Sequence, residues 1–214
     1  GLDFAFSFPA WFLRERELAS VREAWELARR DGEIWLARCE PPFWGRPGRP
    51  RPSSDPDRSP FRSTEGERLP IRGIGPKSVF QIGGAGAVGT GSIRGMPKLV
   101  ELTERGFSIW PFDPPRLPMA VELYPRWLTG RVSKTSEVSR RLFLANHADG
   151  EDRDIVEAAA SSEHAFDAAA SALAMARDVS GLRDLPRDPD PLHRLEGRIW
   201  NPVDMGCARR EEAG

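Results

Sequence analysis

Short apolar runs alternate with longer amphipathic stretches along this chain, and the alternation predicts an α/β protein. The first run, Gly1–Pro9, places Phe4, Phe6 and Phe8 on one face of an extended segment. Asp3 lies on the opposite face of the same segment. We therefore expect a strand or strand end here, whose one carboxylate is either a polar loop residue or a functional group.

Apolar residues at three- and four-residue spacing predict helices farther along the chain. One helix is expected over Arg14–Arg30 and ends at Asp31-Gly32, because glycine often follows a helix C-terminus. Another is expected over Ser133–Ala145, with Val138 and Leu142 on its apolar face. Both helices carry arginines beside their apolar stripes, as expected for helices with one solvated side.

The segment from residue 158 to residue 176 contains ten alanines and predicts a helix that packs closely against its neighbours. A serine at position 161 or 162 can cap this helix, which we expect to run to about Asp178. Glu163 and His164 lie four and three residues before Asp167, so the three side chains can face one direction. Asp167 therefore either faces water or meets a metal or a cation.

A glycine-rich passage resembles a dinucleotide-binding motif. Ser78–Ile82 reads as a strand, Gly84–Gly89 fits G-x-G-x-x-G, and Asp113 follows at about the distance of the expected acid. Gly95 and Pro97, however, interrupt the helix that should follow the third glycine. The passage therefore favours a glycine-rich turn followed by a helix starting near Gly95 and Pro97, with a nucleotide-binding oxidoreductase as the alternative.

Three isolated acids lie in apolar surroundings. Glu122 is carried by Met119–Tyr124, which reads as a short buried strand, and Asp3 and Asp167 lie in the runs described above. Burying a carboxylate costs several kcal/mol unless a metal, a cation or hydrogen bonds compensate it. We interpret the three acids as groups that the fold brings together to hold a divalent metal.

Residues 41–75 form a proline- and arginine-rich irregular loop in this interpretation. Residues 41–70 contain eight prolines, and residues 46–72 contain seven arginines against four acids. Arginine pairs bidentately with phosphate, so the loop either contacts a phosphate backbone or is a solvated insertion.

The bulk composition favours one domain over residues 1–214 with a charged, frayed tail at residues 208–214. The chain is 39% hydrophobic, which is enough for a real core, and its net charge of −1 indicates no particular partner. Its two cysteines, Cys39 and Cys207, favour a reduced, cytoplasmic setting. No apolar run approaches the roughly 18–20 residues of a membrane span, so no membrane is expected. Zinc spacing, a G-x-S-x-G elbow and a Walker A motif are all absent from the sequence.

Several segments together resemble the domain-of-unknown-function 429 family, whose members are described as predicted nucleases with an RNase H-like fold. The resemblance is carried by Gly1–Pro9, Pro42–Gly45, Lys77–Gly91, Glu122–Pro125, His164–Ala168 and Glu196–Trp200. It implies an RNase H-like mixed sheet with helices on both faces and acids that gather from strands and a late helix. It also implies that the chain is incomplete at its N-terminal end, because the opening strand and its aspartate would precede Gly1.

The leading functional prediction is a metal-dependent nuclease that hydrolyses phosphodiester bonds in a nucleic acid or another phosphodiester substrate. Asp3, Glu122 and Asp167 would hold Mg²⁺ or Mn²⁺, with Glu122 as a ligand or a structural acid. His164 would position water or substrate. The candidates for phosphate contacts are Arg46, Lys77 and Arg94. Besides the oxidoreductase, a nucleic-acid-binding module without catalysis stays open.

Overall fold

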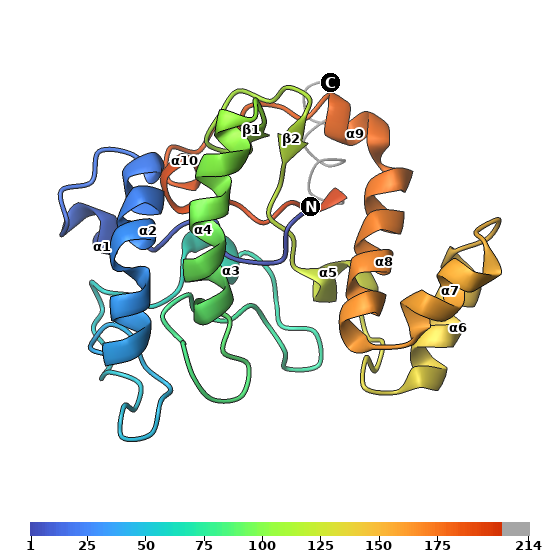
Figure 1. Ribbon diagram of the computed structural model, residues 1–214, viewed down its shortest axis with the longest axis horizontal. Coiled ribbons are helices and arrows are strands. Elements are labelled where there is room, and N and C mark those ends of the chain that lie inside the picture. The colour runs from blue at the N-terminus through green and yellow to red at the C-terminus, as the bar shows by residue number, and fades with distance from the viewer. Residues whose placement is uncertain (203–214) are drawn as a thin grey trace.

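The structure, a computed structural model that describes residues 1–202, is mostly helical (Figure 1). Helices hold 46% of the chain and strands only 5%, so the expected RNase H-like mixed sheet with helices on both faces is wrong. The elements are α1 (Ala10–Arg14), α2 (Val21–Arg38), α3 (Ser63–Gly66), α4 (Gly89–Glu104), β1 (Ser108–Ile109), β2 (Met119–Ala120), α5 (Pro125–Thr129), α6 (Glu137–His147), α7 (Arg153–Ala160), α8 (Glu163–Arg177), α9 (Val179–Arg183) and α10 (His193–Glu196).

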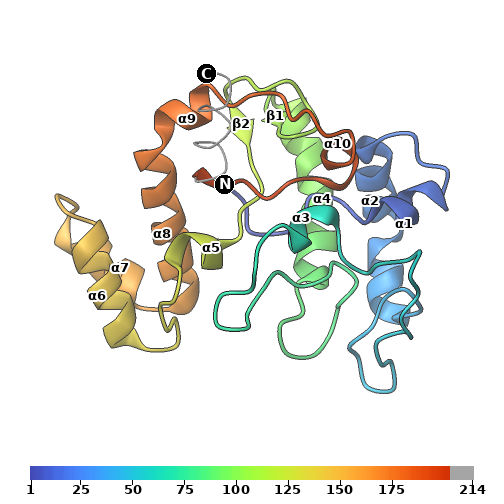
Figure 2. The same ribbon diagram turned by 180° about the vertical axis from the view of Figure 1, so that it is seen from behind.

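The two strands form a parallel pair, with Ser108 opposite Met119 and Ile109 opposite Ala120. In Figures 1 and 2, α1, α2 and α4 lie on one side of this pair and α5 to α9 on the other. The backbone beyond β2 stays extended and forms parallel bridges from Glu122 to Leu2 and to Ile199. The N-terminal segment therefore lies between β2 and α8, where the candidate site is found.

The sheet stays small because few backbone groups of the apolar runs pair with another strand. Pro118 and Pro125 flank the β2 segment, and proline cannot donate a ladder hydrogen bond. In the first run the N–H of Ala5 donates to the Ser92 hydroxyl at 3.0 Å, and that of Phe6 to the Glu122 carboxylate at 2.9 Å. Side chains take the place of a neighbouring strand, so the expected strand over residues 1–9 is reduced to one bridge.

Helices α2 and α4 pack against each other through positions that the sequence interpretation misjudged. Asp31 and Gly32 do not end a helix but lie inside α2, which runs on to Arg38. A Cβ at Gly32 would lie 2.7 Å from Ile93 of α4, so glycine there permits close helix contact. Helix α4 begins at Gly89 and continues through Gly95, where a Cβ would collide with the Phe4 ring at 2.7 Å. The expected helix start at Gly95 and Pro97 is therefore wrong.

The C-terminal half matches the expected helices more closely. Helix α8 begins after Ser162, whose hydroxyl accepts a hydrogen bond from the N–H of Ala165, and Asp178 is its C-cap. In α6, however, Val138 and Leu142 are exposed, whereas Arg140 and Leu144 are buried. Arg140 is buried because its guanidinium donates to the carbonyls of Ala160 and Lys134.

Three hydrophobic clusters hold these parts together. The largest joins the N-terminal phenylalanines to α2 and α4, a second lies between β2 and the segment around Trp200, and a third joins α6, α7 and α8. No helix within residues 1–202 is both long and apolar enough to cross a lipid bilayer. The predicted frayed tail at residues 208–214 and Cys207 lie outside the described residues, while Cys39 is buried.

Candidate functional site

Glu122 lies directly after β2 and is held by Arg62 from the proline-rich loop. The two Nη nitrogens of Arg62 donate to the two carboxylate oxygens of Glu122 at 2.8 and 2.5 Å. The N–H of Phe6 adds a third hydrogen bond at 2.9 Å, and Glu122 is only 2% exposed. Bidentate pairing of this kind satisfies a carboxylate fully, so Glu122 is a structural acid.

Arg62 is the centre of a buried cluster that also contains Glu65, Glu122 and Glu196. We call these four residues the Arg62 cluster. Arg62 donates to the Glu65 carboxylate and to the Glu196 carbonyl, both at 3.0 Å. The Glu196 carboxylate accepts the N–H groups of Ala10 and of the residue after Arg62. Burial alone would lower the pKa of Arg62, but Glu122 and Glu65 raise it, so the arginine stays charged.

Asp3 and Asp167 lie apart from this cluster and line a different cavity, of about 480 Å³, together with His164 of α8. We call this cavity the acid pocket. Asp167 projects from α8 and forms an ion pair with Lys134, whose Nζ lies 2.5 Å from its Oδ1. The two side chains are 22% and 11% exposed, whereas Asp3 and His164 are exposed residues at the edge of the pocket.

The charges of the acid pocket influence one another. Partial withdrawal of the Asp3 carboxyl from water, and then the nearby Asp167, raise the pKa of Asp3 to about 6. Lys134 and His164 act in the opposite direction, and Glu122 adds a smaller increase. Because Asp3 as a residue remains exposed, solvent screens part of this interaction. Asp3 and Asp167 thus line one cavity, whereas the Glu122 carboxylate pairs with Arg62.

Two residues of this neighbourhood have no counterpart in the sequence prediction. Lys134 comes from the loop before α6, and no spacing links it to Asp167 in α8. Tyr124 follows Glu122, and burial raises the pKa of its phenol, with further increases from Asp3 and Asp167 that Arg126 opposes. The one feature of the sequence that could have pointed to Tyr124 is its place in the segment Glu122–Pro125. Arg62, likewise, was one arginine among seven in its loop.

The arrangement decides which metal site these residues can form. Within residues 1–202, no group of three or more His, Cys, Asp or Glu side chains is placed to hold a metal ion. The expected site of three carboxylates is therefore not formed, because Arg62 occupies Glu122. Asp3 and Asp167 are the two carboxylates that remain on the acid pocket, and one or two carboxylates can bind Mg²⁺ when substrate phosphates complete its ligands.

The predicted phosphate-contacting residues lie elsewhere. Arg94 of α4 forms an exposed ion pair with Glu33 of α2 at 2.7 Å. Lys77 runs past Gly86, where a Cβ would lie 3.5 Å from its Cε. Neither these two residues nor Arg46 is among the described residues that line the acid pocket. The structure does not bring the three basic residues together with the acids.

The glycine-rich passage forms a tight turn before α4. Gly84 and Gly86 have φ of 76° and 74°, a backbone region that favours glycine. A Cβ at Gly89 would lie only 2.2 Å from the Val79 carbonyl oxygen, so the third glycine permits a close backbone approach. In the described part of the chain Gln81 forms one bridge, to Trp44, and no regular strand precedes the turn. The strand that a dinucleotide-binding unit requires at this place is therefore missing.

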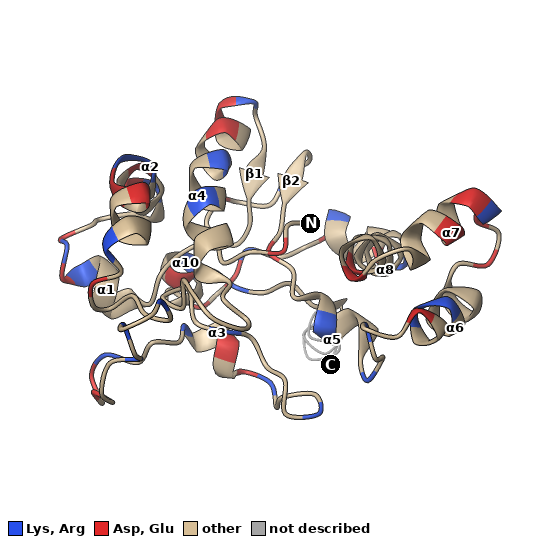
Figure 3. Ribbon diagram, turned by 60° about the horizontal axis from the view of Figure 1, so that its bottom comes forward, with Lys and Arg blue, Asp and Glu red and all other residues tan. Residues whose placement is uncertain are grey.

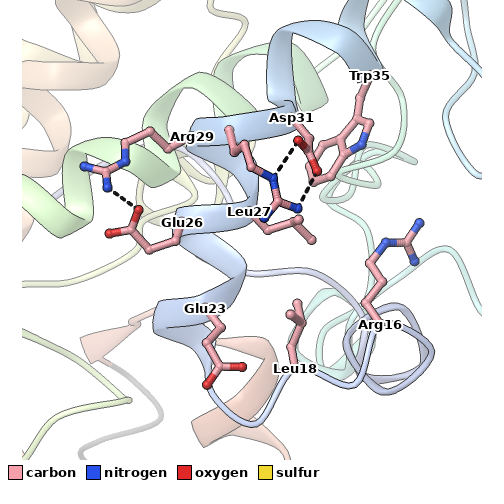
Figure 4. A pocket seen from close by; sticks show the side chains of 9 residues that line it. Arg16, Leu18, Glu23, Glu26, Leu27, Arg29, Asp31 and Trp35 are labelled. Atoms are coloured by element: carbon pink, nitrogen blue, oxygen red, sulfur yellow. Dashed lines mark hydrogen bonds and ion pairs between the residues drawn. The ribbon is translucent and has the colours of Figure 1, made fainter.

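A larger hollow lies along α2, away from both groups of acids (Figure 4). It measures about 870 Å³, and four of its charged side chains form ion pairs: Arg29 with Glu26 at 2.5 Å, and Arg30 with Asp31 at 2.9 Å. These are exposed ion pairs of one helix, which contribute little energy, and the Glu23 carboxylate accepts the N–H of Ala19. Arg16, which precedes α2, also lines this hollow.

Comparisons with protein-family models, curated proteins and solved structures find no match to this chain.

Proposed function

We propose that this protein is a metal-dependent hydrolase of phosphodiester bonds and that the reaction takes place in the acid pocket. The observation that carries the proposal is the meeting of Asp3 and Asp167, from opposite ends of the sequence, on one cavity with His164. Two carboxylates that share a half-buried space repel each other unless positive charge is supplied. Lys134 supplies only one such charge.

Asp3 and Asp167 would hold Mg²⁺ or Mn²⁺ in this proposal. When bound, the metal supplies positive charge that activates water and stabilises the leaving oxygen of a phosphodiester. A cation between the two carboxylates would relieve the repulsion that Lys134 leaves uncompensated. Glu122 has no part in this site, because its oxygens accept hydrogen bonds from Arg62 and Phe6.

Residues beside and within the pocket would bind the substrate. Lys134, which adjoins the pocket through its ion pair with Asp167, has an ammonium group that can donate to a phosphate oxygen as well. His164 lies exposed on the same face of α8, three residues before Asp167, and can orient a phosphate group at the pocket edge. Leu123 and Pro125 line the opposite wall and give the pocket an apolar surface next to the acids.

The proposal is tested by incubating the protein with single- and double-stranded oligonucleotides and with bis(p-nitrophenyl) phosphate. We expect cleavage that requires millimolar Mg²⁺ or Mn²⁺. Asp167→Asn should lower the rate by more than about 100-fold, since losing even a residue that merely supports a metal ligand costs about 10–100-fold. Glu163→Gln, an exposed acid of the same helix, is the matched control and should cleave as the wild type does. Absence of cleavage with either metal, or equal rates in wild type and Asp167→Asn, would overturn the proposal.

A further inference from the structure

A second cavity, of about 560 Å³, lies between the end of α1 and the proline-rich loop. We call it the Trp11 pocket. Its lining residues come from α1 and the turn after it, the loop after α2 and Phe80, whereas α8 contributes to the lining of the acid pocket. Helices α1 and α2 lie on one side of β2 and α8 on the other (Figures 1 and 2). Its size falls within the range of about 300–1,000 Å³ that is usual for small-molecule sites.

Aromatic rings form the inner wall of the Trp11 pocket. Trp44 and Phe80 are buried, whereas Trp11 is half-buried and keeps part of its indole open to the cavity. The ring centroids of Trp11 and Phe80 lie 5.4 Å apart, and the indole N–H of Trp11 donates to the Ser59 carbonyl at 2.7 Å. The indole is thus held in a fixed orientation, which suits stacking against a flat ring.

Three arginines surround this wall, and they differ in whether they form ion pairs. Arg58 lies 2.8 Å from the Glu15 carboxylate and 3.8 Å from that of Asp55, so the two acids of the pocket are paired with it. Figure 3 shows basic and acidic segments close together on the loops beside α1 and α3. Arg58 therefore has a structural role in fixing the loop.

Arg16 and Arg51 are the remaining two. Arg16 lies 3.5 Å above the Phe12 ring, and Arg51 lies 5.6 Å from the Trp44 ring centroid. Neither guanidinium has a carboxylate oxygen of residues 1–202 within 4.0 Å. Each is held over an aromatic ring, and Arg16 also donates from one nitrogen to the Phe12 carbonyl at 3.3 Å. The other donors of a guanidinium held in this way can pair with phosphate. The pocket therefore offers a flat apolar wall together with two guanidinium groups that form no ion pair within residues 1–202, and its three arginines outnumber its two acids by one charge.

We propose that the Trp11 pocket binds a nucleotide, with the base stacked on Trp11 and the phosphate bound by Arg16 and Arg51. Stacking on an aromatic side chain accepts any base, so the pocket would show little base preference. The same chemistry is present in a free mononucleotide and in one nucleotide of a single strand. The proposal does not depend on catalysis in the acid pocket, whose residues line a separate cavity.

The test is calorimetric titration of the full chain at low salt with AMP, adenosine, ribose 5-phosphate and a short oligothymidylate. AMP should bind more tightly than adenosine, which lacks the phosphate, and than ribose 5-phosphate, which lacks the base. Arg51→Gln should weaken AMP binding by about tenfold or more, since each charge-assisted hydrogen bond contributes to affinity at this level. Trp11→Leu should weaken it by at least about fivefold through loss of stacking. Arg49→Gln is the matched control, because Arg49 is an exposed arginine of the same loop outside the pocket lining.

The two nucleotide sources are separated by comparing AMP with the oligothymidylate. Binding of either probe that is weakened in Arg51→Gln and retained in Arg49→Gln supports the pocket, and the tighter probe identifies the source. Asp167→Asn should bind as the wild type does. The proposal is overturned if neither probe binds, or if Arg51→Gln and Arg49→Gln bind equally well. Circular dichroism of Trp11→Leu and Arg51→Gln shows whether each variant is folded, and Arg51, being exposed, keeps the test valid if Trp11→Leu unfolds.

Discussion

The Arg62 cluster and the acid pocket both contain carboxylates in apolar surroundings, but they differ in what neutralises them. In the Arg62 cluster a fully buried guanidinium and backbone N–H groups satisfy the oxygens of Glu122 and Glu196. In the acid pocket Lys134 faces two aspartates, and Asp3 remains partly open to solvent. An acid in an apolar run is therefore a candidate metal ligand only when the fold leaves its carboxylate without a complete set of hydrogen-bond and ion-pair partners.

The largest effect is expected from breaking the Arg62 cluster. Arg62→Met leaves Glu122 buried without its cation, which should lower the free energy of unfolding by about 3–5 kcal/mol. The measurement is urea denaturation followed by circular dichroism. Arg46→Met, at an exposed position of the same loop, should have little effect. If Arg62→Met is too unstable to purify, Arg62→Met/Glu122→Met should recover part of the loss. A loss below about 1 kcal/mol would show that the pair is as weak as a surface ion pair.

A smaller effect is expected at His193, whose neighbourhood resembles the Arg62 cluster in having complete partners. Its ring nitrogens lie 2.6 Å from the Glu67 carboxylate and 3.2 Å from that of Asp188. Hydrogen bonds that the protonated ring donates to the carboxylates of Asp188 and Glu67 raise the pKa of His193 to about 9. Its protonated form therefore adds stability that is complete below pH 6.5 and is lost as the pH rises through 9.

Replacing His193 tests whether its protonated form stabilises the folded state. We expect the free energy of unfolding of the wild type to fall by about 1–2 kcal/mol between pH 6.5 and 9.5, and this decline to be absent in His193→Gln. His147→Gln should keep the decline, because His147 stacks on Phe143 and lies outside the His193 cluster. Equal pH profiles in wild type and His193→Gln would exclude the charged histidine as the cause.

The smallest effect is expected from Asp3, because solvent screens it. The folded state binds the Asp3 proton more tightly than the unfolded state, whose pKa is near 3.8. Stability should therefore fall as the pH rises from about 4 to about 6 in metal-free buffer, and Asp3→Asn should remove this part of the slope. Asp57→Asn, an exposed acid in the loop, serves as the control. An unchanged slope in Asp3→Asn would mean that Asp3 ionises independently of the pocket.

Local signals predicted the helices well where capping residues specify the ends. Ser162 precedes the first residue of α8 and Asp178 follows its last, as expected. The same kind of signal failed at Gly32, because glycine there serves the contact with Ile93 of α4 rather than a helix end. Such a contact between separate helices leaves no trace in the sequence around the glycine.

The sheet and the three-acid site could not be predicted because both depend on long-range partners. The alternating phenylalanines suggested a strand, yet the N–H groups of Ala5 and Phe6 donate to Ser92 and Glu122. The Glu122 segment correctly indicated a buried carboxylate, but its partner Arg62 lies in a loop that the composition assigned either to phosphate contacts or to a solvated insertion. His164 and Asp167 share a helix face by spacing alone, and this part of the site was predictable.

The most direct test of the contrast between the two regions is Mn²⁺ binding, measured by the electron paramagnetic resonance signal of the free ion. We predict binding by the wild type and by Glu163→Gln, and binding weakened by more than about tenfold in both Asp3→Asn and Asp167→Asn. Folded Glu122→Gln should bind Mn²⁺ as the wild type does, because the Glu122 carboxylate pairs with Arg62 and not with the metal. Equal binding in wild type, Asp3→Asn and Asp167→Asn, or loss of binding in folded Glu122→Gln alone, would contradict the account.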